Sequence, residues 1–255
     1  MISTDNLAKT AVLILISTEL MFAPISGAKI LFIPANFNSH VQCFSRLASD
    51  LAQLGHVTRV LAPSNARVPH FIKELAGGAN FSYTTYQVDG EEPYSNSRQL
   101  SAASLRLAAS HSTWEKLSLW SDILVELFNH CESDCARLVE NDHILKRLRD
   151  EGYQFAVMDP IVAQCYYAIP YSLGVPYASL SVPGLTWLYR VPRFPSFVPS
   201  LGFSYTDRMS FVQRLTTFLV EQLLLLKIQN YTTTYVDRLA PDRPSINSYQ
   251  LTQQV

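Results

Sequence analysis

Several features that would place this protein in a common functional class are missing from its sequence. The 255 residues carry a formal net charge of -1, only 16% of them are charged, and no basic stripe is present. Nucleic acid is therefore not an expected partner. The loop after the first apolar strand lacks the GxGxxG pattern of a dinucleotide site, so no nucleotide cofactor is expected there. No GxSxG segment occurs, which disfavours an α/β hydrolase.

Apolar residues, by contrast, are plentiful. They make up 48% of the chain and include 13 Tyr and 13 Phe. That is enough for one large α/β domain. The aromatic residues suit a cavity for a lipophilic ligand, and an ordinary core explains them equally well.

The most informative stretch is a strand–loop–helix–strand unit at residues 28–63. An apolar run leads into a polar loop, and His40 follows at the start of a helix whose apolar residues recur at helical spacing. Gly55 ends this helix, and residues 57–61 predict a second buried strand. This order indicates a parallel sheet, in which ligands bind where strands end and helices begin. His40 is therefore a candidate for acid–base chemistry.

The N-terminus has the features of a targeting segment. Lys9 precedes an apolar run, and small residues follow it up to Ala28, which is the order of a cleaved signal peptide. One acidic residue interrupts the run, and an uncleaved anchor is the alternative, although the run is short for a membrane span. We predict a signal peptide at residues 1–28 and a location in the lumen of the endoplasmic reticulum. In that compartment, Asn80 and Asn230 are candidate glycosylation sites.

Four cysteines could form disulfides in that compartment, and the sequence leaves their state open: Cys43, Cys131, Cys135 and Cys165. Cys131 and Cys135 are four residues apart in one predicted helix, a spacing that more often packs on one face than bridges. His130 and Asp134 beside them raise the idea of a metal site, but a helix-surface cluster without a second pair of ligands is weak evidence. No metal is expected. Cys43 and Cys165 each follow a candidate site loop and could lie close in space.

A second candidate residue ends another predicted strand. Residues 153–160 are mostly apolar and end at Asp159 and the proline after it, and a helix with an internal proline follows. A carboxylate there lies on the same sheet edge as His40. It could accept a hydrogen bond from one ring nitrogen of His40 and leave the other nitrogen as a base. The simpler alternative is that Asp159 caps the next helix and His40 is an ordinary polar residue. Spacing alone favours that alternative.

Further helical and strand patterns lie between residues 67 and 149. Residues 67–76 predict a short helix and residues 81–88 predict a strand. Residues 100–149 are predicted to be helical, with an apolar stripe that includes Trp114 and with Asp142 capping the last helix.

Three stretches together resemble the N-terminal half of an animal UDP-glucuronosyltransferase, of glycosyltransferase family 1. KILFIPANFNSHVQCFSRLASDLAQLGHVTRVLAPS, at residues 29–64, resembles the opening strand, the His-bearing loop and the first helix. FAVMDPIVAQCYYAIPYSLGVPYASLS, at residues 155–181, resembles the strand that ends in the family's Asp. FPSFVPSLGFSYTDRMSFVQRLTTFL, at residues 194–219, is the most specific of the three. Phe197 and Thr206 stand where the family usually has Tyr and Ser.

The resemblance implies a Rossmann-like parallel sheet flanked by helices, as in the N-terminal domain of a GT-B glycosyltransferase. It also implies inverting transfer of a sugar, typically glucuronic acid or glucose, from a UDP-sugar co-substrate to the hydroxyl of a small lipophilic acceptor. The family's catalytic His falls on His40 and its partner Asp on Asp159. By the same resemblance, we expect acceptor contacts at Phe37, Asn38 and Phe44.

The sequence also departs from the family. After Asn230 it resembles neither the family's donor-binding signature nor its membrane-spanning segment. The helix predicted at residues 211–228 is amphipathic, so it could pack on the domain or lie at a membrane surface. We expect residues 29–255 to form an incomplete acceptor half that is inactive alone, either as a fragment or with the donor half supplied by a partner chain. The alternative is a non-catalytic luminal subunit that binds lipophilic ligands or pairs with full-length relatives.

Overall fold

The computed structural model describes residues 27–66, 80–88, 98–110, 112–159, 164–180, 194, 196–198, 205–229 and 234–244. Most of the predicted signal peptide, the predicted helix at residues 67–76 and the sequon at Asn230 lie outside these residues. The described elements are the strands β1 (Lys29–Ile33), β2 (Val57–Pro63), β3 (Phe81–Tyr86), β4 (Phe155–Met158) and β5 (Tyr177–Ser179), and the helices α2 (Asn38–Gln53), α4 (Arg98–Ala109), α5 (Thr113–Val139), α6 (Asp142–Asp150), α7 (Gln164–Leu173), α8 (Phe211–Gln229) and α9 (Thr234–Leu239).

The five strands form one parallel sheet in the order β3-β2-β1-β4-β5. At the carboxyl ends of the central strand β1 and its neighbour β4, Ile33 of β1 stands opposite Met158 of β4. This is the strand order of a Rossmann-type sheet, in which the connections change direction between the first and fourth strands. The predicted Rossmann-like parallel sheet flanked by helices is confirmed.

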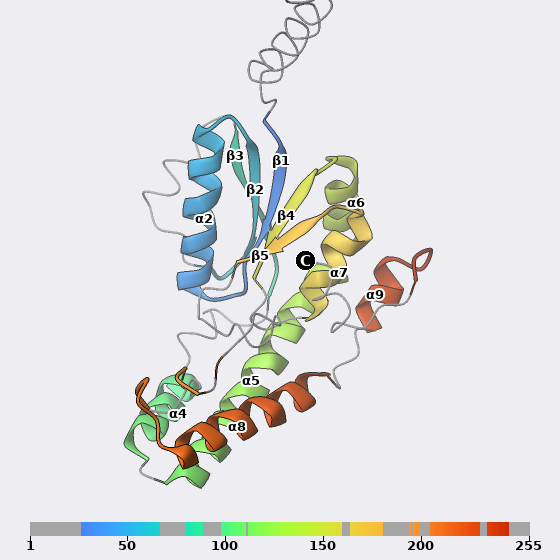
Figure 1. Ribbon diagram of the computed structural model, residues 1–255. Coiled ribbons are helices and arrows are strands. Elements are labelled where there is room, and N and C mark those ends of the chain that lie inside the picture. Colours follow the sequence, from blue (N-terminus) through green and yellow to red (C-terminus); the bar gives the residue numbers. More distant parts are fainter. Residues whose placement is uncertain are drawn as a thin grey trace, which may run out of the picture.

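Helices cover both faces of the sheet (Figure 1). The helix α2 packs on one face, where Phe44 meets Phe32 of β1 edge to face with ring centroids 6.5 Å apart. The helices α5, α6 and α7 contribute apolar side chains to a second cluster, which includes Leu31 and Ile33 of the same strand, and α9 packs on α5 and α7. Because successive side chains of a strand point to opposite faces, a single strand contributes to both cores.

The helical region predicted at residues 100–149 consists of three helices, and two details of that prediction are wrong. Asn141 caps α6, because its Oδ1 accepts the backbone N–H of Ile144 at 3.1 Å, whereas Asp142 is the first helical residue. Trp114 does not belong to a buried stripe, since 81% of it is exposed at the N-terminal end of α5.

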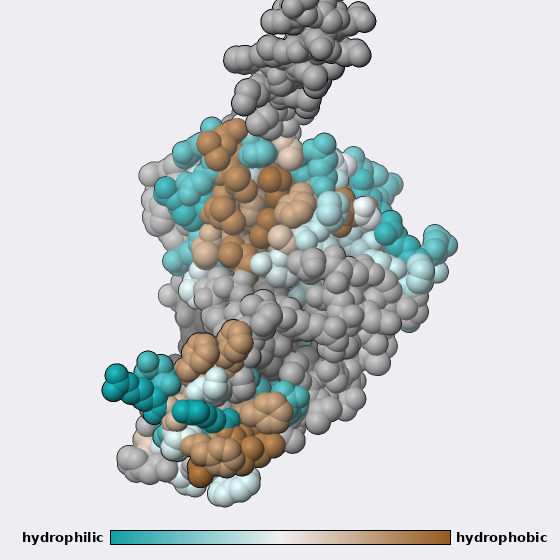
Figure 2. Space-filling view, viewed as in Figure 1, coloured by the Kyte–Doolittle hydropathy of each residue, from teal (hydrophilic) through white to brown (hydrophobic). Residues whose placement is uncertain are grey.

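The helix predicted at residues 211–228 is present as α8, and its apolar face points outward. Figure 2 shows this patch in brown at the lower end of the molecule. The inward face of α8 carries Thr217, Val220 and Glu221. No helix in the described part of the chain is both long enough and apolar enough to cross a membrane. Among the described side chains of α8, the exposed apolar residues are Phe211, Val212, Leu215, Phe218 and Leu219.

The cysteines differ in state. Cys43 is free and exposed on α2, Cys131 is free and buried on α5, and Cys135 is disulfide-bonded. Cys43 therefore forms no bridge with Cys165, whose side chain lies outside the described set. Of the two sequons, Asn80 is described, and it is exposed in the turn before β3.

Candidate active site

The two candidate residues meet at the point where the strand order changes direction. Asp159 directly follows β4, and its backbone N–H donates to the carbonyl oxygen of Ile33 at 2.9 Å. His40 lies in the first turn of α2, after the loop that leaves β1. In open α/β sheets, ligands bind outside the carboxyl ends of the strands at this switch point.

His40 and Asp159 are joined by a short hydrogen bond between His40 Nδ1 and Asp159 Oδ2. Asp159 is fully buried, and the same Oδ2 also accepts the backbone N–H of Ala35 at 3.3 Å. An ionised carboxylate can only accept a hydrogen bond, so this contact favours the tautomer with the proton on Nδ1, in which Nε2 keeps its lone pair. This arrangement suits a general base that takes a proton at Nε2.

Phe37 packs beside this pair. Its ring centroid lies 4.9 Å from that of His40, with the two planes tilted by 40°. Phe37 is also the N-cap residue of α2, and its side chain makes no capping hydrogen bond. The ring therefore shields one side of the imidazole from water, and His40 is itself only 7% exposed.

The three expected acceptor contacts are placed differently. Phe37 contacts His40, and Asn38 is half-buried at the first position of α2. Phe44 is fully buried in the core between α2 and the sheet. A side chain enclosed by that core is not available to a ligand at the sheet edge, so the structure does not support an acceptor contact there. Phe44 is one helical turn from His40 and falls on the sheet-facing stripe of α2.

A second buried contact in this region joins two residues that no sequence pattern pairs. Asn36, in the loop between β1 and α2, donates from Nδ2 to Oδ2 of Asp134 on α5 at 2.6 Å. Both side chains are buried. His130 Nε2, one turn earlier on α5, lies 3.4 Å from the same Asp134 oxygen. Among the described residues, no three His, Cys, Asp or Glu side chains gather into a metal site.

The buried groups around Asp134 stay protonated at neutral pH. Burial raises the pKa of the Cys131 thiol well above its usual value, and the charges of Asp134 and Asp159 raise it further. Burial also raises the pKa of Tyr86 and Tyr166, whose hydroxyls lie 3.0 Å apart, with Asp134 adding to both shifts. A protonated, buried thiol is a poor nucleophile, so Cys131 is not a candidate for covalent catalysis.

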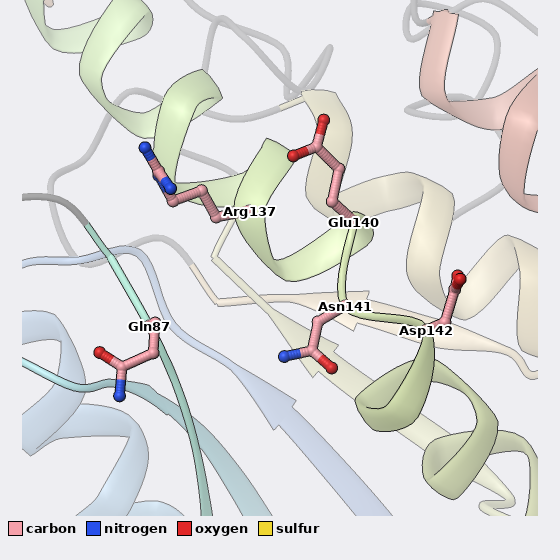
Figure 3. Close-up of a pocket in the computed structure, with 5 residues that line it drawn as sticks. All are labelled: Gln87, Arg137, Glu140, Asn141 and Asp142. Carbon is pink, nitrogen blue, oxygen red and sulfur yellow. The ribbon is translucent and has the colours of Figure 1, made fainter.

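A polar cavity of about 390 Å³ lies elsewhere, at the junction of α5 and α6. Figure 3 shows its lining, which comes from those two helices and from the end of β3. Asn141 is already engaged as the cap of α6, and Glu140 is exposed and ion-paired with Arg238 at 3.6 Å. The lining residues are Gln87, Arg137, Glu140, Asn141 and Asp142. Neither His40 nor Asp159 is among them, and no function follows from the cavity.

The chain is similar to known glycosyltransferases. A family model described as "UDP-glucoronosyl and UDP-glucosyl transferase" matches residues 28–247. Mouse 2-hydroxyacylsphingosine 1-beta-galactosyltransferase is 30% identical over 199 residues, which are 74% of this chain and 32% of the relative. UDP-glucuronosyltransferase 2A3 of Cavia porcellus is 24% identical over 215 residues, which are 82% of this chain and 40% of the relative. The chain thus spans about a third to two fifths of the length of these relatives.

Solved structures with some likeness include two glycosyltransferases. Spinosyn forosaminyltransferase SpnP aligns with a TM-score of 0.36 and 18% identity over 63% of this chain and 33% of its own. TcCGT1 in complex with UDP aligns with a TM-score of 0.38 and 10% identity over 78% of this chain and 42% of its own.

Proposed function

Because the chain belongs to the UDP-glucuronosyl and UDP-glucosyl transferase family, we propose that it contributes the acceptor side of a UDP-sugar transferase site, with His40 as general base. The acceptor is the hydroxyl of a small lipophilic molecule. The observation that carries this proposal is the buried hydrogen bond between His40 and Asp159 at the switch point of the sheet.

In the proposed reaction, Nε2 of His40 takes the hydroxyl proton of the acceptor. The acceptor oxygen forms a bond to the anomeric carbon of the sugar as the bond from that carbon to the UDP oxygen breaks, and UDP leaves with the electron pair. The configuration at the anomeric carbon is inverted. Asp159 holds the imidazole in one tautomer and balances the positive charge that it gains. A positioned general base is worth roughly 10²–10⁴-fold in rate.

We propose that the UDP-sugar is held by a second domain that faces the carboxyl edge of this sheet, in the same protein or in a partner chain. General-base assistance acts only on a bound donor. The 255-residue chain on its own should therefore bind lipophilic phenols or steroids without releasing UDP.

The test is a UDP-release assay on the chain alone and on the chain fused to the C-terminal portion of one of its relatives. We expect turnover only from the fusion, and His40→Ala should lower its kcat by roughly 10²-fold or more. The matched control is His143→Ala, because His143 is exposed on α6. A His40→Ala fusion as active as its parent would remove His40 from the mechanism. Ligand binding with no turnover in any pairing would favour the binding-subunit function instead.

A further inference from the structure

A second buried carboxylate holds the loop that carries His40. Asp134 is 1% exposed and lies on α5, which packs on the face of the sheet opposite to α2. Its Oδ2 accepts the side-chain N–H of Asn36 at 2.6 Å. The amide oxygen of Asn36 is buried and has no hydrogen-bond partner in the described part of the chain. The orientation of the Asn36 side chain therefore depends on Asp134.

Two consecutive loop residues are thus held by two carboxylates from different elements. Asp159, after β4, accepts the backbone N–H of Ala35, and Asp134, on α5, accepts the side chain of Asn36. This loop is also tied to the start of α2, because the backbone N–H of Phe37, the N-cap residue, donates to the carbonyl oxygen of Ala35 at 2.7 Å. His40 lies one turn further along α2.

We propose that Asp134 is a positioning residue that acts through Asn36 to hold His40 in hydrogen-bonding register with Asp159. The inference rests on the proposed role of His40 as the base. A buried carboxylate is costly unless it is well paired, and a charge-assisted hydrogen bond is stronger than a neutral one. An anchor of this kind therefore fixes a loop more firmly than an apolar contact would.

The negative charge of Asp134 also affects neighbouring titratable groups in the core. Its charge contributes to the raised pKa of Tyr86, Tyr166 and Cys131, although burial is the largest cause in each case. His130 Nε2 lies 3.4 Å from Oδ2 of Asp134. Asp134 is therefore a buried charged group in direct contact with the loop that precedes His40.

The first test needs no sugar transfer. Long-range ¹H–¹⁵N spectra of the ¹⁵N-histidine-labelled full chain report the tautomer of each imidazole, and His40 is assigned by its loss in His40→Gln. In the parent, we expect one tautomer with the proton on Nδ1. In Asp134→Ala, we expect signals averaged between tautomers, because the loop no longer holds the ring against Asp159. Ser133→Ala, an exposed neighbour on α5, should leave the spectrum unchanged.

The second test is kinetic and uses the fusion with a relative's C-terminal portion. Asp134→Ala should lower kcat about 10- to 100-fold, with little change in the KM for the acceptor, because misplacing a catalytic group by about 1 Å costs up to ~10²-fold. Asn36→Asp alone should be worse, since it puts two carboxylates at hydrogen-bond distance. Combining Asn36→Asp with Asp134→Asn reverses the direction of the hydrogen bond and should restore most of kcat.

These results separate the two proposals. A single Nδ1 tautomer retained in Asp134→Ala would overturn the positioning role whether or not the fusion turns over. Equally, a double variant no better than its single variants would show that the contact does not act on His40. If His40→Ala keeps full activity, the proposed function fails, while the tautomer measurement still decides whether Asp134 positions the ring. Melting temperatures identify any single variant that has unfolded. In that case the double variant Asn36→Asp/Asp134→Asn, which keeps one carboxylate and one amide at the contact, tests the positioning role instead.

Discussion

The backbone N–H of Asp159 donates to the carbonyl oxygen of Ile33 at 2.9 Å, so the pairing of β1 with β4 continues one residue past the end of β4. The position of the Asp159 carboxylate is therefore set by sheet register and not by a flexible loop. The same register places the loop after β1 directly over that carboxylate, where the Ala35 amide and the His40 ring reach it.

Replacing Asp159 by Asn tests the dyad without changing its size. A side-chain amide can donate to Nδ1, which favours the tautomer with its proton on Nε2 and removes the lone pair that the reaction needs. It also leaves the imidazolium without a counter-charge. We expect kcat of the fusion to fall by roughly 10²-fold or more. Asp142→Asn, at an exposed position on α6, is the control. Unchanged kcat for Asp159→Asn would contradict the assignment.

A second charged cluster lies at the opposite, N-terminal edge of the sheet. Glu151 is bridged by Arg59 at 3.0 Å, by Arg147 at 2.8 Å and by Lys29 at 3.8 Å. Burial alone raises the pKa of Glu151. Hydrogen bonds from Tyr153 and Arg147, together with the positive charges of Arg59 and Lys29, outweigh burial and leave this pKa below its ordinary value.

The contribution of Glu151 to the stability of the fold should therefore decrease as the pH falls. A carboxylate with a lowered folded pKa stabilises the protein above its unfolded pKa, roughly 4.3, and loses that contribution as the pH falls through the folded value. We expect Glu151→Gln to lower the melting temperature at pH 7. At pH 3, the melting temperature of the variant should approach that of the parent. Glu140→Gln, in an exposed ion pair, should change little at either pH. A difference for Glu151→Gln that stays constant from pH 7 to pH 3 would refute this assignment.

Processing in the secretory pathway can be checked on protein expressed in animal cells. We expect the mature chain to begin after Ala28 and to carry a glycan on Asn80, which is exposed in the turn before β3. N-terminal sequencing and the mobility of Asn80→Gln measure the two features. Protein that starts at Met1 and carries no glycan would rule out the predicted signal peptide and luminal location.

The outward apolar face of α8 predicts peripheral contact with a membrane surface. Phe211 is 77% exposed and Phe218 is 45% exposed, so replacing both by Ser should leave the melting temperature nearly unchanged. We expect the parent to sediment with phosphatidylcholine vesicles and the double variant to bind at least about tenfold more weakly, because two buried Phe side chains are worth several kcal/mol. Gln222→Ser, exposed on the same helix, is the control. Equal binding by all three proteins would exclude α8 as the contact.

The local elements of this protein follow from its sequence. Apolar runs predict β1, β2 and β4, and helical spacing predicts α2 and α8, because these patterns depend on residues a few positions apart. Since carboxyl ends of parallel strands share one edge, the same patterns place His40 and Asp159 on that edge. The sequence also predicts the core position of Phe44, because this residue belongs to the apolar stripe of α2.

Only the tertiary structure decides which of these residues touch. His40 and Asp159 are 119 positions apart, and Asn36 and Asp134 are 98 apart. Their contacts depend on the pairing of β1 with β4 and on α5 lying next to the loop after β1. No local sequence pattern specifies either arrangement. Sequence spacing determines the face of each element, whereas the order of strands in the sheet determines which faces and ends come together.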